Sequence, residues 1–294
     1  MRHLLILNRI NRNFLNAWKN CFTILFTSIK MPKIIYVALI ALALHSFPLP
    51  GHATSAQEMG LAIAVEADRR ASDFTDYTAD MVMILRNRDG QESRRSIRTL
   101  TLENIEDGDK SLTIFDSPRD IRGTVLLTYG HKIKDDDQWL YLPALKRVKR
   151  ISSSNKSGSF MGSEFAYEDL GSKEIGKYSY TFLREELLEG QNCFVIEMYP
   201  KDVKNSGYSR IVSWVDQKEY RTYRQLFYDK KKSLLKKLQI KDYRQYLGFI
   251  WRAHQLEMEN IQNGKATVLI LSNFKFRNGL SEKDFDKNSL KRMR

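Results

Sequence analysis

The chain has 294 residues, of which 48 are Lys or Arg, 35 are Asp or Glu and two are Cys, so its formal net charge is +13. Apolar residues make up 42% and charged residues 28%, which is close to globular averages and excludes a largely disordered chain. Two Cys exclude a disulfide scaffold, and with only five His they also exclude a Cys/His zinc module.

Residues 1–53 have the pattern of a secretory signal peptide. Lys33 supplies a charged start after Met31, which is a second candidate for the initiating residue, and residues 34–44 form an apolar run. Gly51-His52-Ala53 is a small-x-small exit that predicts cleavage after Ala53. A bilayer span needs about 20 apolar residues, so a cleaved signal is favoured over an uncleaved anchor. Either one exports the rest of the chain.

The predicted exported part, residues 54–294, shows no internal repeat and no Pro- or Ser-rich linker, which indicates a single domain. Because residues 1–53 hold six basic and no acidic side chains, the exported part has 42 basic and 35 acidic ones, a net charge of +7. This charge favours anionic surfaces, and export argues against a nucleic-acid partner. Cys193 is the one cysteine left, so no internal disulfide is expected.

One helix and then a series of strands are predicted in this part. The segment from Ser55 to Glu58 has the capping-box form S-x-x-E, and helical spacing continues to about Ser72. After the helix the apolar period is two, Arg88-Asp89-Gly90 is a hairpin signal, and Ser281 begins a short closing helix. The predicted strands cover residues 77–86, 91–103, 111–115, 124–129, 138–142, 178–184, 192–199, 209–215, 222–228, 234–242, 248–257 and 267–274.

Several of these strands are apolar on both faces. Val82 and Ile84 point one way, whereas Met81, Met83 and Leu85 point the other way. A sheet with one wet face alternates apolar and polar residues, so this sheet must be covered on both sides or curl around an apolar interior. A packed sandwich core and a barrel that holds an apolar ligand are both compatible with this pattern.

No strong catalytic motif is found in residues 54–294. The run from Gly171 to Tyr178 nearly matches the phosphate-loop pattern, but Tyr178 stands where a Ser or Thr would ligate magnesium and a strand follows, so we interpret the run as a basic turn. Glu164, Glu168 and Asp169 could form a carboxylate pair for glycoside hydrolysis, but without a second motif we interpret them as solvated acids. We therefore expect no enzyme, no catalytic residue, no cofactor and no metal site.

Residues 146–167 combine a basic cluster with a later group of aromatic residues. Lys146, Arg147, Lys149 and Arg150 come first, a stretch of small polar residues follows, and Phe160, Met161, Phe165 and Tyr167 end the segment. A flexible basic loop of this kind suits an adaptable apolar contact beside anionic groups. The alternative is a surface loop whose aromatic side chains are buried in the core.

The chain resembles the LolA/LolB-like superfamily, in particular its branch of outer-membrane lipoprotein-sorting proteins. The resemblance covers about residues 55–293 and rests on residues 115–124, 137–147, 158–165, Trp214-Val215-Asp216 and Tyr228-Asp229. It implies a mainly β fold: an incomplete, strongly curved antiparallel barrel of about 11 strands, with an N-terminal helix and short helices that plug the concave side. It also implies a periplasmic location and an apolar cavity that receives lipoprotein acyl chains.

Three functions are compatible with this sequence. The first is a monomeric periplasmic carrier that binds a lipid or lipoprotein acyl chain, with transient membrane contact, for transfer toward the outer membrane. The second is an accessory module of a lipid or RND-type exporter without cargo of its own, and the third is a hydrolase of envelope lipid or glycan. For the carrier, the residues expected to contact an anionic headgroup or a partner are Lys146, Arg147 and Arg150. Those expected at the cavity or its rim are Trp139, Tyr141, Phe160, Met161, Phe165, Trp214 and Trp251.

Overall fold

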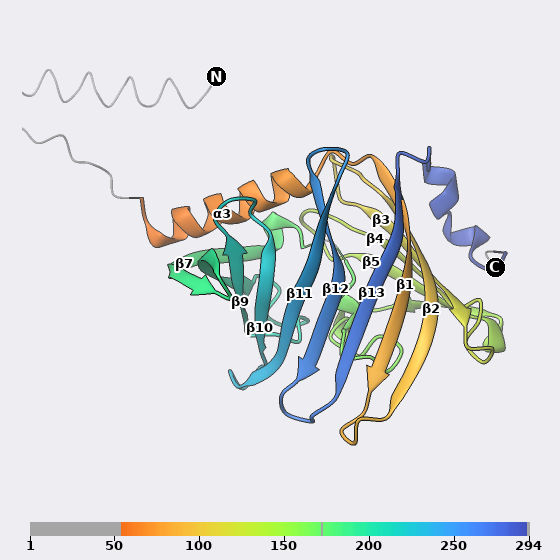
Figure 1. The fold of residues 1–294 in the computed structure, drawn as a ribbon. Helices are drawn as coiled ribbons and strands as arrows, with labels where there is room; N and C mark the ends of the chain where they lie inside the picture. Colours follow the sequence, from red (N-terminus) through yellow and green to blue (C-terminus); the bar gives the residue numbers. More distant parts are fainter. Residues whose placement is uncertain (1–53, 172, 293–294) are drawn as a thin grey trace, which may run out of the picture. The chain divides into compact units, whose positions relative to one another are not determined.

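Thirteen antiparallel strands form one continuous sheet in the computed structural model, which describes residues 54–171 and 173–292 (Figure 1). The predicted signal peptide lies outside these residues. The strands are β1 (Asp76–Arg86), β2 (Glu92–Leu102), β3 (Lys110–Ser117), β4 (Val125–Tyr129), β5 (Asp137–Leu142), β6 (Arg147–Ile151), β7 (Tyr178–Leu188), β8 (Gln191–Pro200), β9 (Arg210–Asp216), β10 (Thr222–Tyr228), β11 (Leu234–Tyr246), β12 (Ile250–Asn260) and β13 (Ala266–Phe276).

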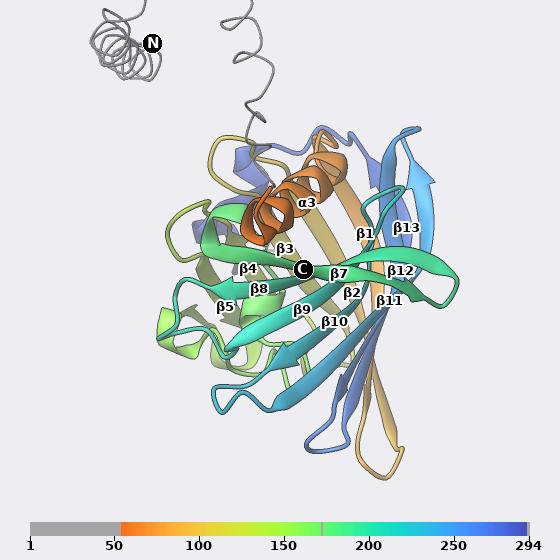
Figure 2. The ribbon, with the colours of Figure 1, turned by 90° about the vertical axis from the view of Figure 1, so that its left-hand side faces the viewer.

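The spatial order of the strands is β6-β5-β4-β3-β2-β1-β13-β12-β11-β10-β9-β8-β7, so the first and last strands of the chain pair in the middle of the sheet. The sheet curls around its inner face but does not close, because the edge strands β6 and β7 do not pair (Figure 2). The predicted mainly β, incompletely closed fold is confirmed. The sheet has 13 strands rather than about 11, and the sequence patterns did not single out β6 because its five residues include three basic ones.

Both faces of the sheet carry buried apolar residues, as the two-faced strands predict. On the inner face, Met83 of β1 belongs to the main core. On the outer face, the C-terminal segment covers β3 to β5: Phe285 and Leu290 are buried there against Leu112 and Leu127. The predicted closing helix at Ser281 is a short 3₁₀ turn, Glu282–Phe285, and it belongs to this outer cover.

The helix α3 (Ala56–Ala71) lies across the mouth of the curled sheet (Figure 2). The predicted capping box is present, since Glu58 donates its backbone N–H to Ser55 Oγ and accepts the Ser55 N–H in return. Because residue 60 is a glycine, the helix packs directly against the backbone of β7. A Cβ atom at Gly60 would lie 2.7 Å from the backbone nitrogen of Phe182. At the other end, Arg252 of β12 donates to the carbonyl of Ala71.

No helix in residues 54–171 and 173–292 combines the length and the apolar character that a membrane-spanning helix needs.

Candidate ligand-binding interior

The inner face of the sheet is an apolar wall built from side chains of many strands. Because successive residues of a strand point to opposite faces, each strand contributes alternate residues to this wall. Its buried members include Met83, Ile97, Phe115, Leu126, Leu238, Met258 and Leu269.

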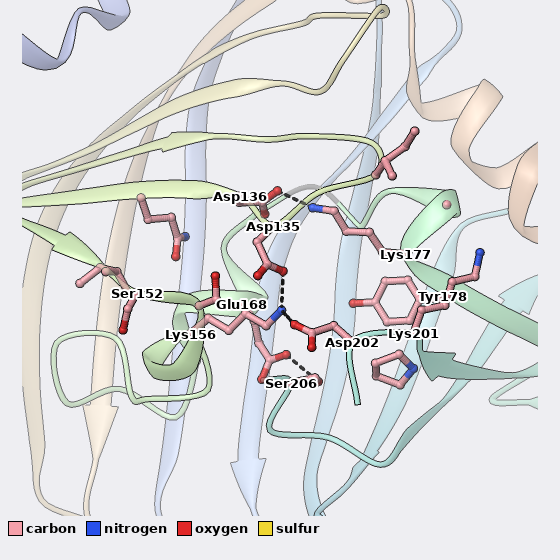
Figure 3. A pocket seen from close by; sticks show the side chains of 16 residues that line it. Asp135, Asp136, Ser152, Lys156, Glu168, Lys177, Tyr178, Lys201, Asp202 and Ser206 are labelled. Carbon is pink, nitrogen blue, oxygen red and sulfur yellow. Dashed lines mark hydrogen bonds and ion pairs between the residues drawn. The ribbon is translucent and has the colours of Figure 1, made fainter. Parts of the chain in front are cut away.

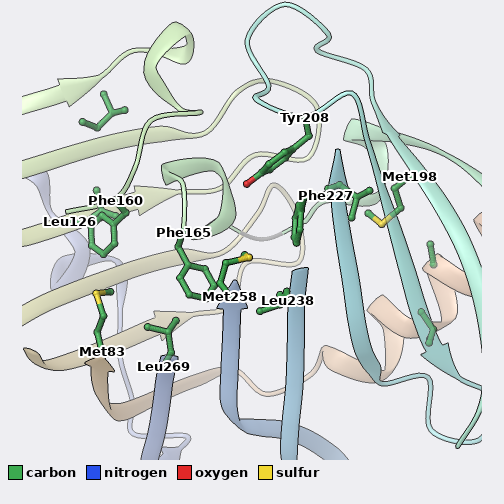
Figure 4. Close-up of a cluster of buried hydrophobic side chains, with 14 of the residues drawn as sticks. Met83, Leu126, Phe160, Phe165, Met198, Tyr208, Phe227, Leu238, Met258 and Leu269 are labelled. Carbon is green, nitrogen blue, oxygen red and sulfur yellow. The ribbon is translucent and has the colours of Figure 1, made fainter. Parts of the chain in front are cut away.

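Residues 158–171, here called the plug segment, enter the curl and pack on this wall (Figure 4). The segment folds into a small hairpin: Phe160 donates its N–H to the carbonyl of Phe165 at 2.8 Å, and Met161 and Gly162 turn the chain with positive φ angles. Phe160 is 0% exposed and its ring centroid lies 5.7 Å from that of Phe115. The aromatic residues of the predicted flexible loop are therefore part of the core, which is the second of the two interpretations considered from the sequence.

Polar contacts tie the tip of the plug segment to the sheet. Asn260 of β12 donates to the Glu164 carboxylate at 2.7 Å, and the Glu164 N–H donates to Thr267 Oγ1 of β13 at 2.9 Å. Arg95 of β2 donates to the carbonyl of Met161 at 2.5 Å. These contacts come from strands that are far from the plug segment in the sequence, so the segment is attached to the wall without being one of its strands.

The base of the plug segment brings two carboxylates to a group of hydrogen-bond donors. Glu168 accepts from Ser206 Oγ at 2.8 Å and from the Gly207 N–H at 2.7 Å, and Asp169 accepts from the Tyr208 hydroxyl at 2.8 Å. Burial raises the pKa of Glu168, although these hydrogen bonds oppose the shift. The expectation that Glu164, Glu168 and Asp169 are solvated is wrong, because each carboxylate has partners inside the protein.

Two lysines lie near Asp169, Lys236 buried and Lys173 half-buried. Lys236 of β11 is 8% exposed, donates to the Tyr208 hydroxyl at 3.2 Å and lies 4.0 Å from the Asp169 carboxylate. Lys173 donates to Gln225 Oε1 at 2.7 Å and lies 5.0 Å from the Phe227 ring centroid. Burial lowers the pKa of Lys173, and the charges of the neighbouring carboxylates only partly offset this. The base of the plug segment is thus a buried ionic cluster beside an apolar wall.

A cavity of about 290 Å³ lies at the gap between the two ends of the sheet, and its lining includes Ile151, Lys156, Glu168, Tyr178 and Ser206 (Figure 3). Charged groups bridge this gap. Lys156 binds Asp202 at 2.6 Å and Asp135 at 3.0 Å, and Lys177 binds Asp136. Burial alone would lower the pKa of Lys156, but the hydrogen bonds to the two aspartates raise it above its ordinary value.

The seven residues predicted at the cavity or its rim fall into two groups. Phe160, Phe165 and Met161 belong to the plug segment and pack on the inner wall. The other four lie on the outer face of the sheet: Trp139 and Tyr141 beside the C-terminal cover, Trp214 where its indole donates to Glu186, and Trp251 beside Arg221. Ligand contact by the three residues of the plug segment remains a prediction, whereas a chain bound to the inner wall would be separated by the sheet from the four on the outer face.

The predicted headgroup contacts lie at the free edge of the sheet. Lys146 turns the chain into β6 with a positive φ of 48°, and Arg147 and Arg150 are exposed on β6 itself. Leu145, next to them, is 63% exposed. Basic side chains and one apolar side chain thus lie together on a free edge, and their role also remains a prediction.

Sequence reasoning missed Tyr208, Lys156, Lys173 and Lys236. Lys236 gives a usable signal, since it shares the inward register of β11 with Leu238 and Ile240. The others have no local signal, because their partners are distant in the sequence. Among the described residues, no group of three or more His, Cys, Asp and Glu side chains is placed to hold a metal ion.

A curled antiparallel sheet with an apolar inner face and a helix across its mouth defines the LolA-like class of folds. A crystal structure of a domain from Vibrio parahaemolyticus, named for outer membrane lipoprotein sorting, has 54% sequence identity and a TM-score of 0.78, and the match covers 80% of this chain and 99% of that one. The chain belongs to the outer-membrane lipoprotein-sorting branch of the LolA/LolB-like superfamily, as the sequence predicted.

Further comparisons agree with this assignment. A DUF1329 family protein from Desulfovibrio piger has 34% identity and a TM-score of 0.77 over 81% of this chain and all of that one. A LolA superfamily protein from Nitrosomonas europaea, at 24% identity, shares the fold with a TM-score of 0.63 over 80% of this chain and 99% of that one. A family model described as that of an uncharacterized protein matches residues 107–292. No curated protein matches the chain.

Proposed function

We propose that the protein is a non-enzymatic periplasmic carrier that binds a lipid or lipoprotein acyl chain against the inner wall for transfer toward the outer membrane. One observation carries this proposal: the side chains that cover the wall, Phe160 and Phe165, come from a separate hairpin rather than from the sheet. When that hairpin withdraws, a continuous apolar surface is left for a chain, and each buried CH₂ contributes about 0.8 kcal/mol.

The comparisons support the location and the class of cargo. The relative from Vibrio parahaemolyticus is named for outer membrane lipoprotein sorting, which supports a periplasmic location and a lipoprotein or lipid cargo for this chain. The carrier needs no cofactor and no catalytic residue, because binding of an acyl chain uses burial alone. Lys146, Arg147 and Arg150, on the free edge, would contact anionic groups of the cargo, the membrane or a partner protein.

The second candidate is an accessory module of a membrane lipid or RND-type exporter without cargo of its own. The filled interior favours this candidate: Phe160 is 0% exposed, so the core is complete without a ligand. In that case the exposed basic edge would be the functional surface.

Native mass spectrometry distinguishes the two candidates. The full chain would be expressed in a Gram-negative host and purified from the periplasm without detergent. The carrier predicts a stoichiometric added mass that organic solvent extracts. A clean unliganded mass, unchanged after incubation with lipid vesicles, would contradict the carrier and favour the exporter module.

A further inference from the structure

We propose that Tyr208, Lys236 and the Ser206–Gly207 turn form a binding site for the anionic headgroup of an acyl lipid, and that the plug segment occupies this site with its own carboxylates in the unloaded protein. This inference rests on the proposed carrier function. It narrows the cargo to lipids whose headgroup has a net negative charge, on a phosphate or a carboxylate that no cation of the same headgroup neutralises.

The position of Lys236 is the first step. A lysine on an apolar wall loses its hydration, which costs free energy unless an anion is close. Lys236 is 8% exposed, and its ammonium has the Tyr208 hydroxyl at 3.2 Å and the Asp169 carboxylate at 4.0 Å. Asp169 belongs to the plug segment, so the negative charge beside this lysine leaves when the segment withdraws. A ligand that displaces the segment must then supply an anion.

The donors around the two carboxylates are of the kind that binds phosphate and carboxylate groups. Ser206 Oγ and the Gly207 N–H donate to Glu168, and the Tyr208 hydroxyl donates to Asp169. Hydroxyl and backbone N–H donors beside an ammonium give strong, charge-assisted hydrogen bonds to an oxyanion. All of these donors lie outside the plug segment, so they remain in place after it withdraws.

The layout of the plug segment matches that of an anionic lipid. Its aromatic residues Phe160 and Phe165 lie on the apolar wall (Figure 4). Its carboxylates Glu168 and Asp169 lie at the polar donors. An acyl chain with a charged headgroup would replace both parts at once, apolar for apolar and anion for anion. After this exchange the apolar wall is still covered, and Lys236 still has an anion beside it.

The cavity at the gap between the two ends of the sheet gives this site a route to solvent. Glu168 and Ser206 line it, together with three lysines and the aspartates that pair with two of them (Figure 3). A headgroup can thus approach along a charged, polar route, without crossing the apolar interior.

The test compares two lipids that share one acyl chain. Lysophosphatidylglycerol is anionic and lysophosphatidylcholine is zwitterionic, and isothermal titration calorimetry measures the Kd of each with the full chain purified from the periplasm and stripped of lipid. We expect the wild-type protein to prefer the anionic lipid by about tenfold or more, as for a charge-assisted hydrogen bond. Lys236→Met should abolish the preference and keep binding. Lys237→Met is the matched control and should leave the preference intact, because Lys237 is the next residue on β11 and pairs with Glu259 instead.

A second variant keeps the test decisive if Lys236→Met fails to fold. Asp169→Asn weakens the internal competitor, so it should tighten binding of the anionic lipid more than that of the zwitterionic one. Equal affinity for both lipids in the wild-type protein would overturn this inference and leave the carrier intact, whereas no binding of either lipid would overturn both. Inorganic phosphate that binds as tightly as lysophosphatidylglycerol would show a site for a free anion and would contradict the assignment to a lipid headgroup.

Discussion

Lys156 joins the two ends of the curled sheet to each other through Asp202, since its ammonium lies 2.6 Å from the Asp202 carboxylate. Lys156 follows the edge strand β6, whereas Asp202 follows β8, the neighbour of the edge strand β7. Lys177 and Asp136 make the reciprocal contact. Neighbouring strands elsewhere in the sheet are held by backbone hydrogen bonds, but here side-chain charges hold the edges together, so this gap is the part of the wall that can separate without breaking a strand pair.

The first prediction concerns this gap. Lys156→Met removes one partner of a partly buried ion pair and should lower the free energy of unfolding by about 1–2 kcal/mol. It should also speed amide hydrogen exchange in β6 and β7 more than in the central strands. Lys149→Met, at an exposed position of β6, is the control. Equal exchange in both variants would show that the ion pair does not hold the edges.

The second prediction concerns pH. Burial raises the pKa of Asp109 to about 6 from its ordinary value of 3.8, and the hydrogen bond from the Asn104 N–H only partly opposes this shift. Between these values Asp109 holds a proton in the folded state that it has lost in the unfolded state, so its contribution to stability should fall as the pH rises from about 4 to about 6.

Asp109→Asn should remove this dependence and raise the free energy of unfolding at pH 7 by about 1–3 kcal/mol. Urea unfolding at pH 4.5 and pH 7 measures both effects. The prediction fails if the difference in the free energy of unfolding between the variant and the wild-type protein is the same at pH 4.5 and at pH 7.

The sequence predicted the architecture better than the interior. Period-two apolar runs and turn signals mark most strands. Successive apolar residues such as Met83 and Ile84 point to opposite faces of their strand, and they correctly predicted that both faces of the sheet are covered. Because both faces of these strands are apolar, the sequence did not show which face is the inner one. Where Leu140 and Trp139 are both apolar, alternation alone cannot tell which of them faces the wall, and Leu140 does.

The plug segment could not be placed from its sequence because its partners are distant in the chain. Glu164 accepts a hydrogen bond from Asn260 of the sheet, and Asp169 accepts one from Tyr208 of another loop. Neither contact leaves a periodic pattern in the local sequence. Isolated acids in a Ser- and Gly-rich stretch are ordinarily solvated. Only the register of the whole sheet brings their donors to one place.

The third prediction tests whether the plug segment yields to a ligand. Phe160→Ala leaves a hole in a fully buried site and should cost about 3 kcal/mol or more in the free energy of unfolding. An acyl lipid that takes the place of this ring should restore part of the loss. The rise in Tm on adding lysophosphatidylglycerol should therefore be larger for Phe160→Ala than for the wild-type protein. The same rise in both proteins would mean that the lipid binds elsewhere.

The fourth prediction locates the chain on one face of the sheet. Trp139, Trp214 and Trp251 all lie on the outer face, so an acyl chain on the inner wall is separated from them by the sheet. A lysolipid brominated on its acyl chain quenches tryptophan by contact and should leave their fluorescence nearly unchanged. Met258→Trp places an indole on the inner wall as a positive control, and this variant should be quenched. Quenching of the wild-type protein that disappears in Trp139→Phe would instead place the acyl chain on the outer face, beneath the C-terminal segment, and would contradict the inner-wall site.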